Sequence, residues 1–147
     1  YKKAKTISDI SGEIVIADDS GLEVECLDGA PGVYSARYGG EDGNDELNNK
    51  KLLEELKGVK EENRDAKFVC VITMIFLNQE KIVVRGECSG RIAFEKKGNQ
   101  GFGYDPLFLV NGFNGRTFAE LGSDIKNQIS HRANALIKLK KELNSRI

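Results

Sequence analysis

Two long apolar segments joined by a short polar stretch dominate the hydropathy pattern of the chain. Residues 67–77 are apolar at nearly every position, which predicts a strand buried on both faces at the centre of a sheet. The polar residues 78–80 predict a turn, and residues 81–95 predict a second strand beside the first. Gly86 and Gly90 weaken this second strand and indicate a bend or a bulge.

Shorter patterns precede this pair of strands. Residues 1–8 are typical of the end of a helix. Residues 13–17 are rich in β-branched side chains and predict a buried strand, which runs into a turn over residues 18–21. Residues 22–25 alternate between apolar and polar positions, as a half-buried strand does.

Loops and one helix fill the segment before the long strands. Residues 28–43 contain many glycines and predict a loop. Asn44 is a candidate N-cap for a helix that continues to about Leu56 with a stripe of leucines on one face. Residues 58–65 are highly charged and predict a surface loop.

The last third of the chain predicts a loop, a short apolar segment and a final helix. The loop at residues 98–105 is rich in glycine and leads into the apolar residues 106–110. Ser130 is a candidate N-cap, and one face of the helix after it would carry Ala133, Leu136, Ile137 and Leu143. Long adjacent strands with helices before and after them predict a mixed α+β domain.

Composition narrows the class of protein. The 147 residues carry 22 Lys and Arg against 23 Asp and Glu, so the net charge of −1 argues against a general nucleic-acid binder. No apolar run approaches the roughly 20 residues that span a bilayer, and we recognise no signal peptide. Three cysteines without a CxxC pair and one histidine argue against a structural zinc site. We expect a cytoplasmic protein whose thiols mostly serve packing.

The acidic pair Asp18 and Asp19 is the first candidate for chemistry. A strand delivers both carboxylates together with Ser20 and Gly21, although successive strand residues point to opposite faces if the strand continues through them. One carboxylate could then bind a metal ion or activate water. Asp and Ser also form ordinary turns, and this alternative stays open.

A second candidate is the glycine-rich loop at residues 98–105. It carries two aromatic residues and an acid on a backbone freed by glycine, but fits neither common phosphate-loop pattern. This suits a planar ring that stacks on an aromatic side chain while backbone amides read its edge. A hairpin loop with buried aromatic residues is the alternative.

Two further segments carry weaker signals. Lys126 and the segment Ser130-His131-Arg132 lie near a helix start, where donors suit a phosphate or a carbonyl-bearing base. A single histidine is nevertheless most often structural. Residues 28–38 could form a cleft wall or a partner surface.

Together these segments resemble one family. The motifs IADDSGL, GAPGVYSARY, GFGYDP and ISHR, at residues 16–22, 29–38, 101–106 and 129–132, occur in the order and approximate spacing of the inosine/xanthosine triphosphate pyrophosphatases. The resemblance extends from residue 1 nearly to the end of the chain. It implies a mixed α/β fold with a central elongated mixed sheet, two lobes around a cleft, and a homodimer.

The resemblance also implies an activity and its residues. The family hydrolyses ITP, dITP and XTP to the monophosphate and pyrophosphate with Mg²⁺. Asp19 matches its metal ligand and proton acceptor, and we expect it in the groove shared by residues 102–105 and His131. Substrate contacts are implied at Lys3, Ser20, Phe102, Gly103, Tyr104, Asp105, Lys126, His131 and Arg132. No partner other than the nucleotide and a second copy of the chain is expected, and neither nucleic acid nor membrane.

Chemical reasoning agrees with this assignment. Mg²⁺ held by carboxylate oxygens offsets the charge of a triphosphate, and a carboxylate can deprotonate the water that attacks the α-phosphorus. Donors on Lys126, His131 or Arg132 suit a 6-oxo purine, whereas the amino group of adenine would meet donor with donor. Such a mismatch costs about 1–3 kcal/mol.

The sequence departs from the family at its beginning. The family opens with a strand, a Thr-Gly-Asn loop and a helix that carries a glutamate metal ligand, and these motifs do not occur here. We therefore expect residues 1–147 to form one pyrophosphatase domain, truncated at its N-terminus and low in activity. A catalytically impaired nucleotide-binding or dimerisation fragment, and a Mg²⁺-dependent pyrophosphohydrolase of other modified nucleotides, remain the alternative functions.

Overall fold

The fold is a four-stranded sheet with helices gathered at one end and along one face. The structure, a computed structural model, describes residues 14–145, so Lys3 and the helix end expected over residues 1–8 lie outside the described residues. The strands are β1 (Val15–Val24), β2 (Asp65–Ile75), β3 (Lys81–Ile92) and β4 (Phe108–Val110), in the spatial order β1-β2-β3-β4. The mixed α/β class is confirmed. Every pairing between the described strands is antiparallel, so the mixture of parallel and antiparallel pairs that we expected is not found among them.

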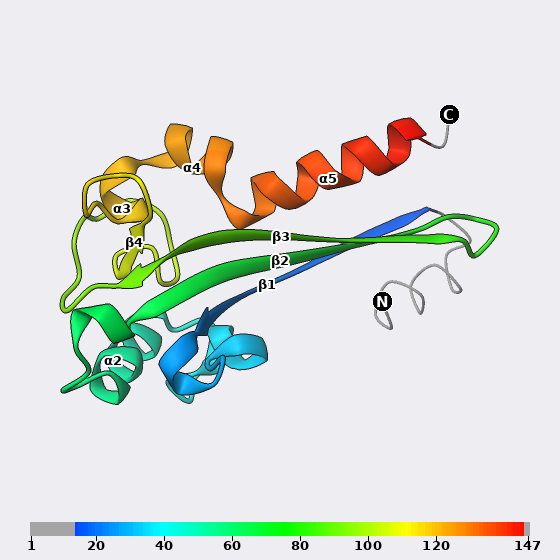
Figure 1. Cartoon of the computed structure of the whole chain (residues 1–147). Coiled ribbons are helices and arrows are strands. Elements are labelled where there is room, and N and C mark those ends of the chain that lie inside the picture. Colours follow the sequence, from blue (N-terminus) through cyan, green and yellow to red (C-terminus); the bar gives the residue numbers. More distant parts are fainter. Residues whose placement is uncertain (1–13, 146–147) are drawn as a thin grey trace.

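The helical elements divide into two groups. Figure 1 shows the long strands extending away from one end, where α2 lies on one side and α3 and α4 lie on the other, while α5 runs along the sheet. The first group contains η1 (Glu25–Leu27), η2 (Gly32–Arg37), α2 (Asp45–Glu55) and η3 (Glu61–Asn63). The second contains α3 (Phe118–Leu121), α4 (Ser123–Ile129) and α5 (His131–Ser145). No helix in the described part of the chain is both long and apolar enough to cross a bilayer.

Strand β1 is longer than the sequence pattern indicated. The expected turn over residues 18–21 is wrong, because β1 continues through these residues and pairs with β2 from Val15 opposite Ile75 to Val24 opposite Ala66. Pairing with the apolar β2 satisfies backbone groups that the local sequence would otherwise satisfy in a turn. Asp18 and Asp19 therefore point to opposite faces of the sheet.

Strand β3 contains no bulge at its glycines. Its residues pair one for one with those of β2 from Lys81 to Arg91, and the strand ends at Ile92 rather than near residue 95. A Cβ atom on Gly86 would lie 2.2 Å from the carbonyl oxygen of His131, and one on Gly90 would lie 2.1 Å from that of Leu109. Both glycines therefore allow another element to approach β3 closely.

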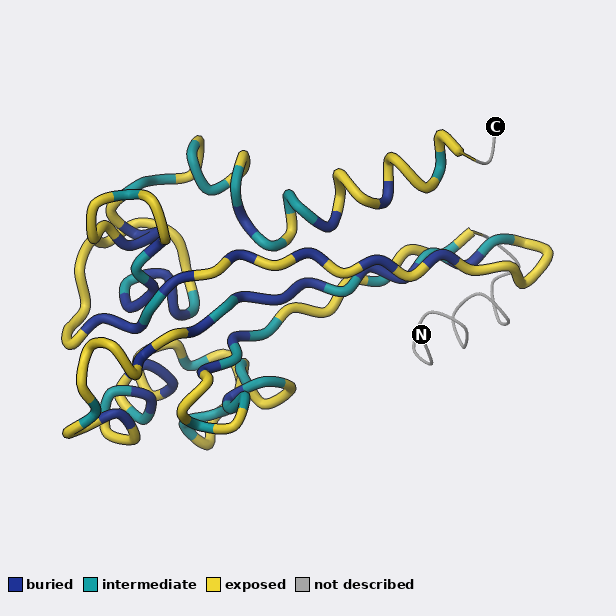
Figure 2. The backbone as a smooth tube through the Cα atoms, in the orientation of Figure 1, coloured by how far each residue is buried: buried dark blue, intermediate teal, exposed yellow. Residues whose placement is uncertain are grey.

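Two buried clusters fill the fold, one at the helical end and one under α5. The second cluster contains Cys70, Ile72, Ile82 and Val84 of the sheet and Ala135 and Leu139 of α5, with Leu143 packed against it. Figure 2 shows the alternating burial of β3 beside the half-buried helix. Leu136 and Ile137, which we expected on the buried face, are 51% and 62% exposed. The register of α5 on the sheet instead buries the residues spaced four apart.

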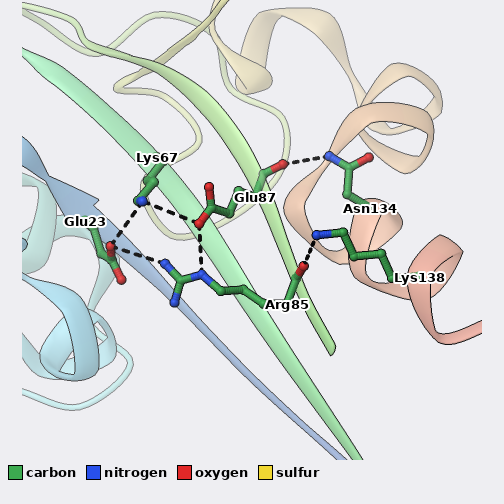
Figure 3. Close-up of polar contacts among 6 residues, drawn as sticks. All are labelled: Glu23, Lys67, Arg85, Glu87, Asn134 and Lys138. Atoms are coloured by element: carbon green, nitrogen blue, oxygen red, sulfur yellow. Dashed lines mark hydrogen bonds and ion pairs between the residues drawn. The ribbon is translucent and has the colours of Figure 1, made fainter. Parts of the chain in front are cut away.

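Polar side chains of α5 attach the helix to the edge of β3. Asn134 Nδ2 donates to the carbonyl of Glu87 and Lys138 Nζ donates to that of Arg85, each at 2.7 Å (Figure 3). Figure 3 also shows the charged side chains of Glu87 and Arg85 bonded to Glu23 and Lys67 of the neighbouring strands. The ion pairs are largely exposed and add little stability. The helix is thus fixed to β3 by its contacts with the strand backbone.

The segment after α2 is only partly the surface loop that we expected. Arg64 is 3% exposed and donates to the carbonyls of Leu56, Val59 and Ala93. Burial lowers the pKa of its guanidinium. The side chain thus joins the end of α2 to the loop that follows it and to the segment after β3.

Two of the three thiols serve packing, as expected. Cys70 and Cys88 are buried, and burial raises the pKa of the Cys88 thiol to about 11, so this side chain stays protonated at neutral pH. Cys26 is exposed.

Candidate active site

A cavity of about 490 Å³ brings together residues from all four candidate segments. Its walls come from β1, from the loop before α2, from the glycine-rich loop and from the junction of α4 and α5. The residues that line it include Ser20, Ser35, Asp45, Phe102, Gly103, Tyr104, Asp105, Lys126, His131 and Arg132. This volume lies within the range of small-molecule sites.

The glycine-rich loop presents one aromatic ring to the cavity and buries the other. Phe102 is 68% exposed and lines the cavity, whereas Tyr104 is 5% exposed and its hydroxyl donates to the carbonyl of Ser35 at 2.6 Å. Burial raises the pKa of the Tyr104 phenol, so this residue acts as a neutral donor. Phe102 is therefore the ring available for stacking, and Tyr104 fastens the loop to the opposite wall.

Two backbone amides of this loop are already bonded within the protein. The N–H of Phe102 donates to Asp105 Oδ2 at 3.2 Å, and the N–H of Gly103 donates to Asp45 Oδ2 at 2.9 Å. An N–H that already donates a strong hydrogen bond to a carboxylate is a poor donor for a ligand. At Phe102 and Gly103, donors to a ring edge must therefore come from side chains.

Lys126 is the cation at the centre of the cavity wall. Its Nζ lies 2.6 Å from Asp105 Oδ2 and 4.1 Å from the centre of the Phe102 ring. The Asp105 side chain is 4% exposed, so this ion pair is largely shielded from water. One N–H of the ammonium group donates to Asp105, and the other two can donate to acceptor atoms of a ligand.

His131 is a neutral imidazole stacked inside the site. Its ring lies 4.9 Å from the Phe68 ring at an angle of 20°. Burial, and after it the charges of Lys126 and Arg132, lower its pKa to about 4, against a smaller opposing effect of Asp18. Its Nδ1 is buried and has no hydrogen-bond partner among the described residues. The neutral ring offers one donor and one acceptor.

We expect His131 to make stability depend on pH between about 6.5 and 4. Because its pKa is 6.5 before folding and about 4 in the fold, the unfolded chain binds more protons in this window. This contribution to the free energy of unfolding is fully present above pH 6.5 and is lost as the pH falls through 4. Urea unfolding of wild type and His131→Gln at pH about 7.5 and about 5 measures it. Equal losses of stability in the two proteins between these pH values would show that His131 does not cause the pH dependence.

Asp18 and Asp19 occupy different positions relative to the cavity. Asp18 shares a sheet face with Ser20, and its Oδ2 lies 3.1 Å from Arg132 Nε at the start of α5. Asp19 pairs with Val71 on the other face and is not among the residues that line the cavity, although Ser20 and Gly21 are. The groove that we expected to contain Asp19 therefore ends one residue short of it, because β1 does not turn at this point.

The donor set around β1 is suited to a metal ion only in part. Within residues 14–145 no group of three or more His, Cys, Asp and Glu side chains could hold an ion. Mg²⁺ in nucleotide sites, however, takes one or two carboxylates and draws its other ligands from phosphates and water. The exposed carboxylate of Asp19 fits this limited role.

Sequence reasoning missed residues that shape the cavity without chemistry of their own. Ser35 Oγ accepts from the N–H of Leu22 and donates to the carbonyl of Gly32, which joins the loop to β1. Asn48 and Asn49 are 3% exposed and bond to loop backbone. Asn favours neither helix interiors nor burial. Two consecutive Asn residues inside a predicted helix could therefore have indicated that α2 binds a neighbouring loop through its side chains.

Comparisons with known sequences identify similar proteins. The sequence model of the Ham1 family matches residues 1–142. A dITP/XTP pyrophosphatase of Clostridium tetani is 52% identical over 149 residues, which cover 99% of this chain and 73% of that protein. A dITP/XTP pyrophosphatase of Clostridium perfringens is 60% identical over 130 residues, 88% of this chain and 63% of that protein. The chain therefore spans about two thirds of the length of these curated relatives.

Solved structures agree. The Ham1 protein of Staphylococcus aureus superposes with a TM-score of 0.92 at 46% identity, covering 99% of this chain and 74% of that one. A nucleoside-triphosphatase, also described as a dITP/XTP pyrophosphatase, of Mycobacterium abscessus gives a TM-score of 0.84 at 41% identity, covering 94% of this chain and 70% of that one.

Proposed function

The chain belongs to the Ham1 family, and from this premise we propose that it hydrolyses non-standard purine nucleoside triphosphates such as ITP, dITP and XTP. The products would be the nucleoside monophosphate and pyrophosphate. Relatives 52% and 60% identical carry the name dITP/XTP pyrophosphatase. The observation that carries the proposal is the single cavity that unites Phe102, Lys126 and His131 with β1.

The base would lie in the cavity between the exposed face of Phe102 and the start of α5. Lys126 would donate to the 6-oxo group with an N–H that Asp105 does not use. His131, being neutral, would accept or donate at the ring edge, and Arg132 would add donors beside it. An adenine amino group would leave these donors unpaired, which disfavours ATP by roughly tenfold or more.

The phosphates would leave the cavity past Ser20 and reach Asp19. Ser20 lines the cavity, and Asp19 is the next residue along an edge strand of the described sheet. The phosphates would therefore pass around this edge to the face that carries the Asp19 side chain. Mg²⁺, the cofactor that we propose, would be held by Asp19 and would offset the phosphate charge when bound. Asp19 would also accept the proton of the water that attacks the α-phosphorus. Lys3, a proposed substrate contact, lies outside the described residues.

A homodimer and a cytoplasmic location complete the proposal. Val33 of η2 is 80% exposed and its neighbour Tyr34 is 58% exposed, and we propose these adjacent side chains as part of the dimer contact. Sedimentation measures the oligomeric state directly. The cytoplasmic nucleotide pool is where non-standard triphosphates would be encountered.

A matched substrate panel tests the proposed activity. Purified chain is given ITP, XTP, ATP, GTP and dUTP with Mg²⁺, and pyrophosphate release is measured. We expect kcat/KM for ITP to exceed that for ATP by at least about tenfold, because the two bases differ at the position that Lys126 would read. Equal rates for ITP and ATP would contradict the recognition scheme. A preference for a pyrimidine triphosphate would favour the alternative class of hydrolase.

A further inference from the structure

Helix α2 supplies two side chains that bond to both polar backbone groups of one loop residue. Asp45 Oδ2 accepts the N–H of Gly103, and Asn49 Nδ2 donates to the carbonyl of Gly103, each at 2.9 Å. Asp45 and Asn49 lie one turn apart on the helix, so both face the glycine-rich loop. We propose that Asp45 and Asn49 are positioning residues that hold the two peptide groups on either side of Gly103 and thereby set the selectivity of the base pocket.

Gly103 has a conformation that leaves the loop backbone free to rotate unless other groups bond to it. Its φ is +60°, in the left-handed region that glycine enters freely, and an added Cβ would meet no atom within 4 Å. Packing around the residue therefore does not fix the backbone here. The two bonds from α2 restrain Gly103 itself, while Asp105 and Ser35 hold its neighbours Phe102 and Tyr104.

The orientation of Gly103 decides where its neighbours point. Phe102 is exposed at the cavity, whereas Tyr104 is a buried part of the cavity wall, where its hydroxyl donates to the carbonyl of Ser35. Rotation of either peptide group between them would move the Phe102 ring relative to Lys126, whose Nζ lies 4.1 Å from the ring centre. The position of the stacking ring relative to this donor thus depends on the two peptide groups that α2 holds.

Burial of Asn49 supports a role beyond packing. The side chain is 3% exposed, and its Oδ1 has no hydrogen-bond partner within the described residues. An unpaired buried oxygen costs free energy that an apolar side chain of the same size would avoid. The donated bonds of Nδ2, to Gly103 and to the carbonyl of Asp45, are what the amide gains at this position.

Binding of the product nucleotides tests this proposal, which rests on the proposed function for the identity of the base. Calorimetry with IMP and AMP compares wild type with Asn49→Leu, Asp45→Ala and Asp45→Asn. We expect Asn49→Leu and Asp45→Ala to reduce the ratio of IMP to AMP affinity by about tenfold. Asp45→Asn keeps an acceptor oxygen for the Gly103 N–H and should restore most of the ratio.

A variant at the far end of the helix separates positioning from stability. Glu54 is exposed in the last turn of α2, so Glu54→Gly should lower Tm without changing the ratio of affinities. An equal loss of selectivity in Glu54→Gly would overturn the proposal. An unchanged ratio in both Asn49→Leu and Asp45→Ala would overturn it as well.

Hydrogen exchange of the Gly103 amide gives a second readout that needs no nucleotide. We expect exchange at least about tenfold faster in Asp45→Ala than in wild type, and near wild type in Asp45→Asn. If wild type binds neither IMP nor AMP, the proposed function fails, and the exchange rates alone decide the positioning role. Unchanged exchange in Asp45→Ala would then overturn it.

Discussion

Asp19→Asn should lower kcat for ITP hydrolysis by about a hundredfold or more while leaving the affinity for IMP near wild type. An amide keeps the size of the side chain but neither accepts a proton from water nor holds Mg²⁺ as a carboxylate does. IMP affinity should persist because Asp19 does not line the cavity that we assign to the base. Steady-state kinetics with saturating Mg²⁺ and calorimetry with IMP measure the two effects separately.

The preceding residue is a matched comparison on the same strand. Asp18 is bonded to Arg132 and faces the cavity side, so Asp18→Asn should chiefly raise KM by releasing Arg132. The two substitutions make the same chemical change one position apart, and the strand directs them to opposite faces. A loss of kcat in Asp18→Asn with wild-type kcat in Asp19→Asn would reverse our assignment of the catalytic carboxylate.

Gly86→Ala should destabilise the fold by about 1–3 kcal/mol and weaken IMP binding at the same time. The added Cβ would lie 2.2 Å from the His131 carbonyl oxygen and 2.2 Å from the Ala135 nitrogen, both backbone atoms of α5. The helix must therefore move as a unit, and it carries His131 and Arg132 at its first turn. Urea unfolding measures the first effect and calorimetry with IMP the second.

A substitution elsewhere on β3 provides the control. Val83 is 50% exposed, so Val83→Thr keeps the β-branched shape and should change stability by no more than about 0.5 kcal/mol. Wild-type stability of Gly86→Ala would show that α5 does not approach β3 as closely as the structure indicates. Lower stability with unchanged IMP affinity would show that the packing of α5 on β3 does not affect the site that binds the base.

Local sequence predicted the apolar central strand and the capped start of the last helix. The run of apolar residues at 67–77 correctly indicated the central strand, because β2 lies between β1 and β3 and buries residues of both its faces, such as Val69 and Cys70. Ser130 was correctly identified as an N-cap, since its Oγ accepts the N–H of Ala133. The order of the four motifs indicated the family, which the match over residues 1–142 confirms.

Predictions failed where a distant contact outweighed a local preference. Asp18 to Gly21 are ordinary turn formers, yet pairing with β2 keeps them in a strand. Gly86 was interpreted as a bulge, but it makes room for α5. Leu136 and Ile137 were assigned to the buried face because their spacing fits a helix, whereas the sheet selects Ala135 and Leu139.

The amino-acid sequence by itself therefore determined the class of fold, the central strands and the residue types that suit a purine nucleotide. Only the tertiary structure decided which of them meet: it brought Lys126 onto Asp105, separated Asp18 from Asp19, and assigned Asp45 and Asn49 to Gly103. The physical reason is that propensity and hydropathy act over a few neighbouring residues. Side-chain pairing across a cavity instead depends on the register of strands and helices far apart in the chain.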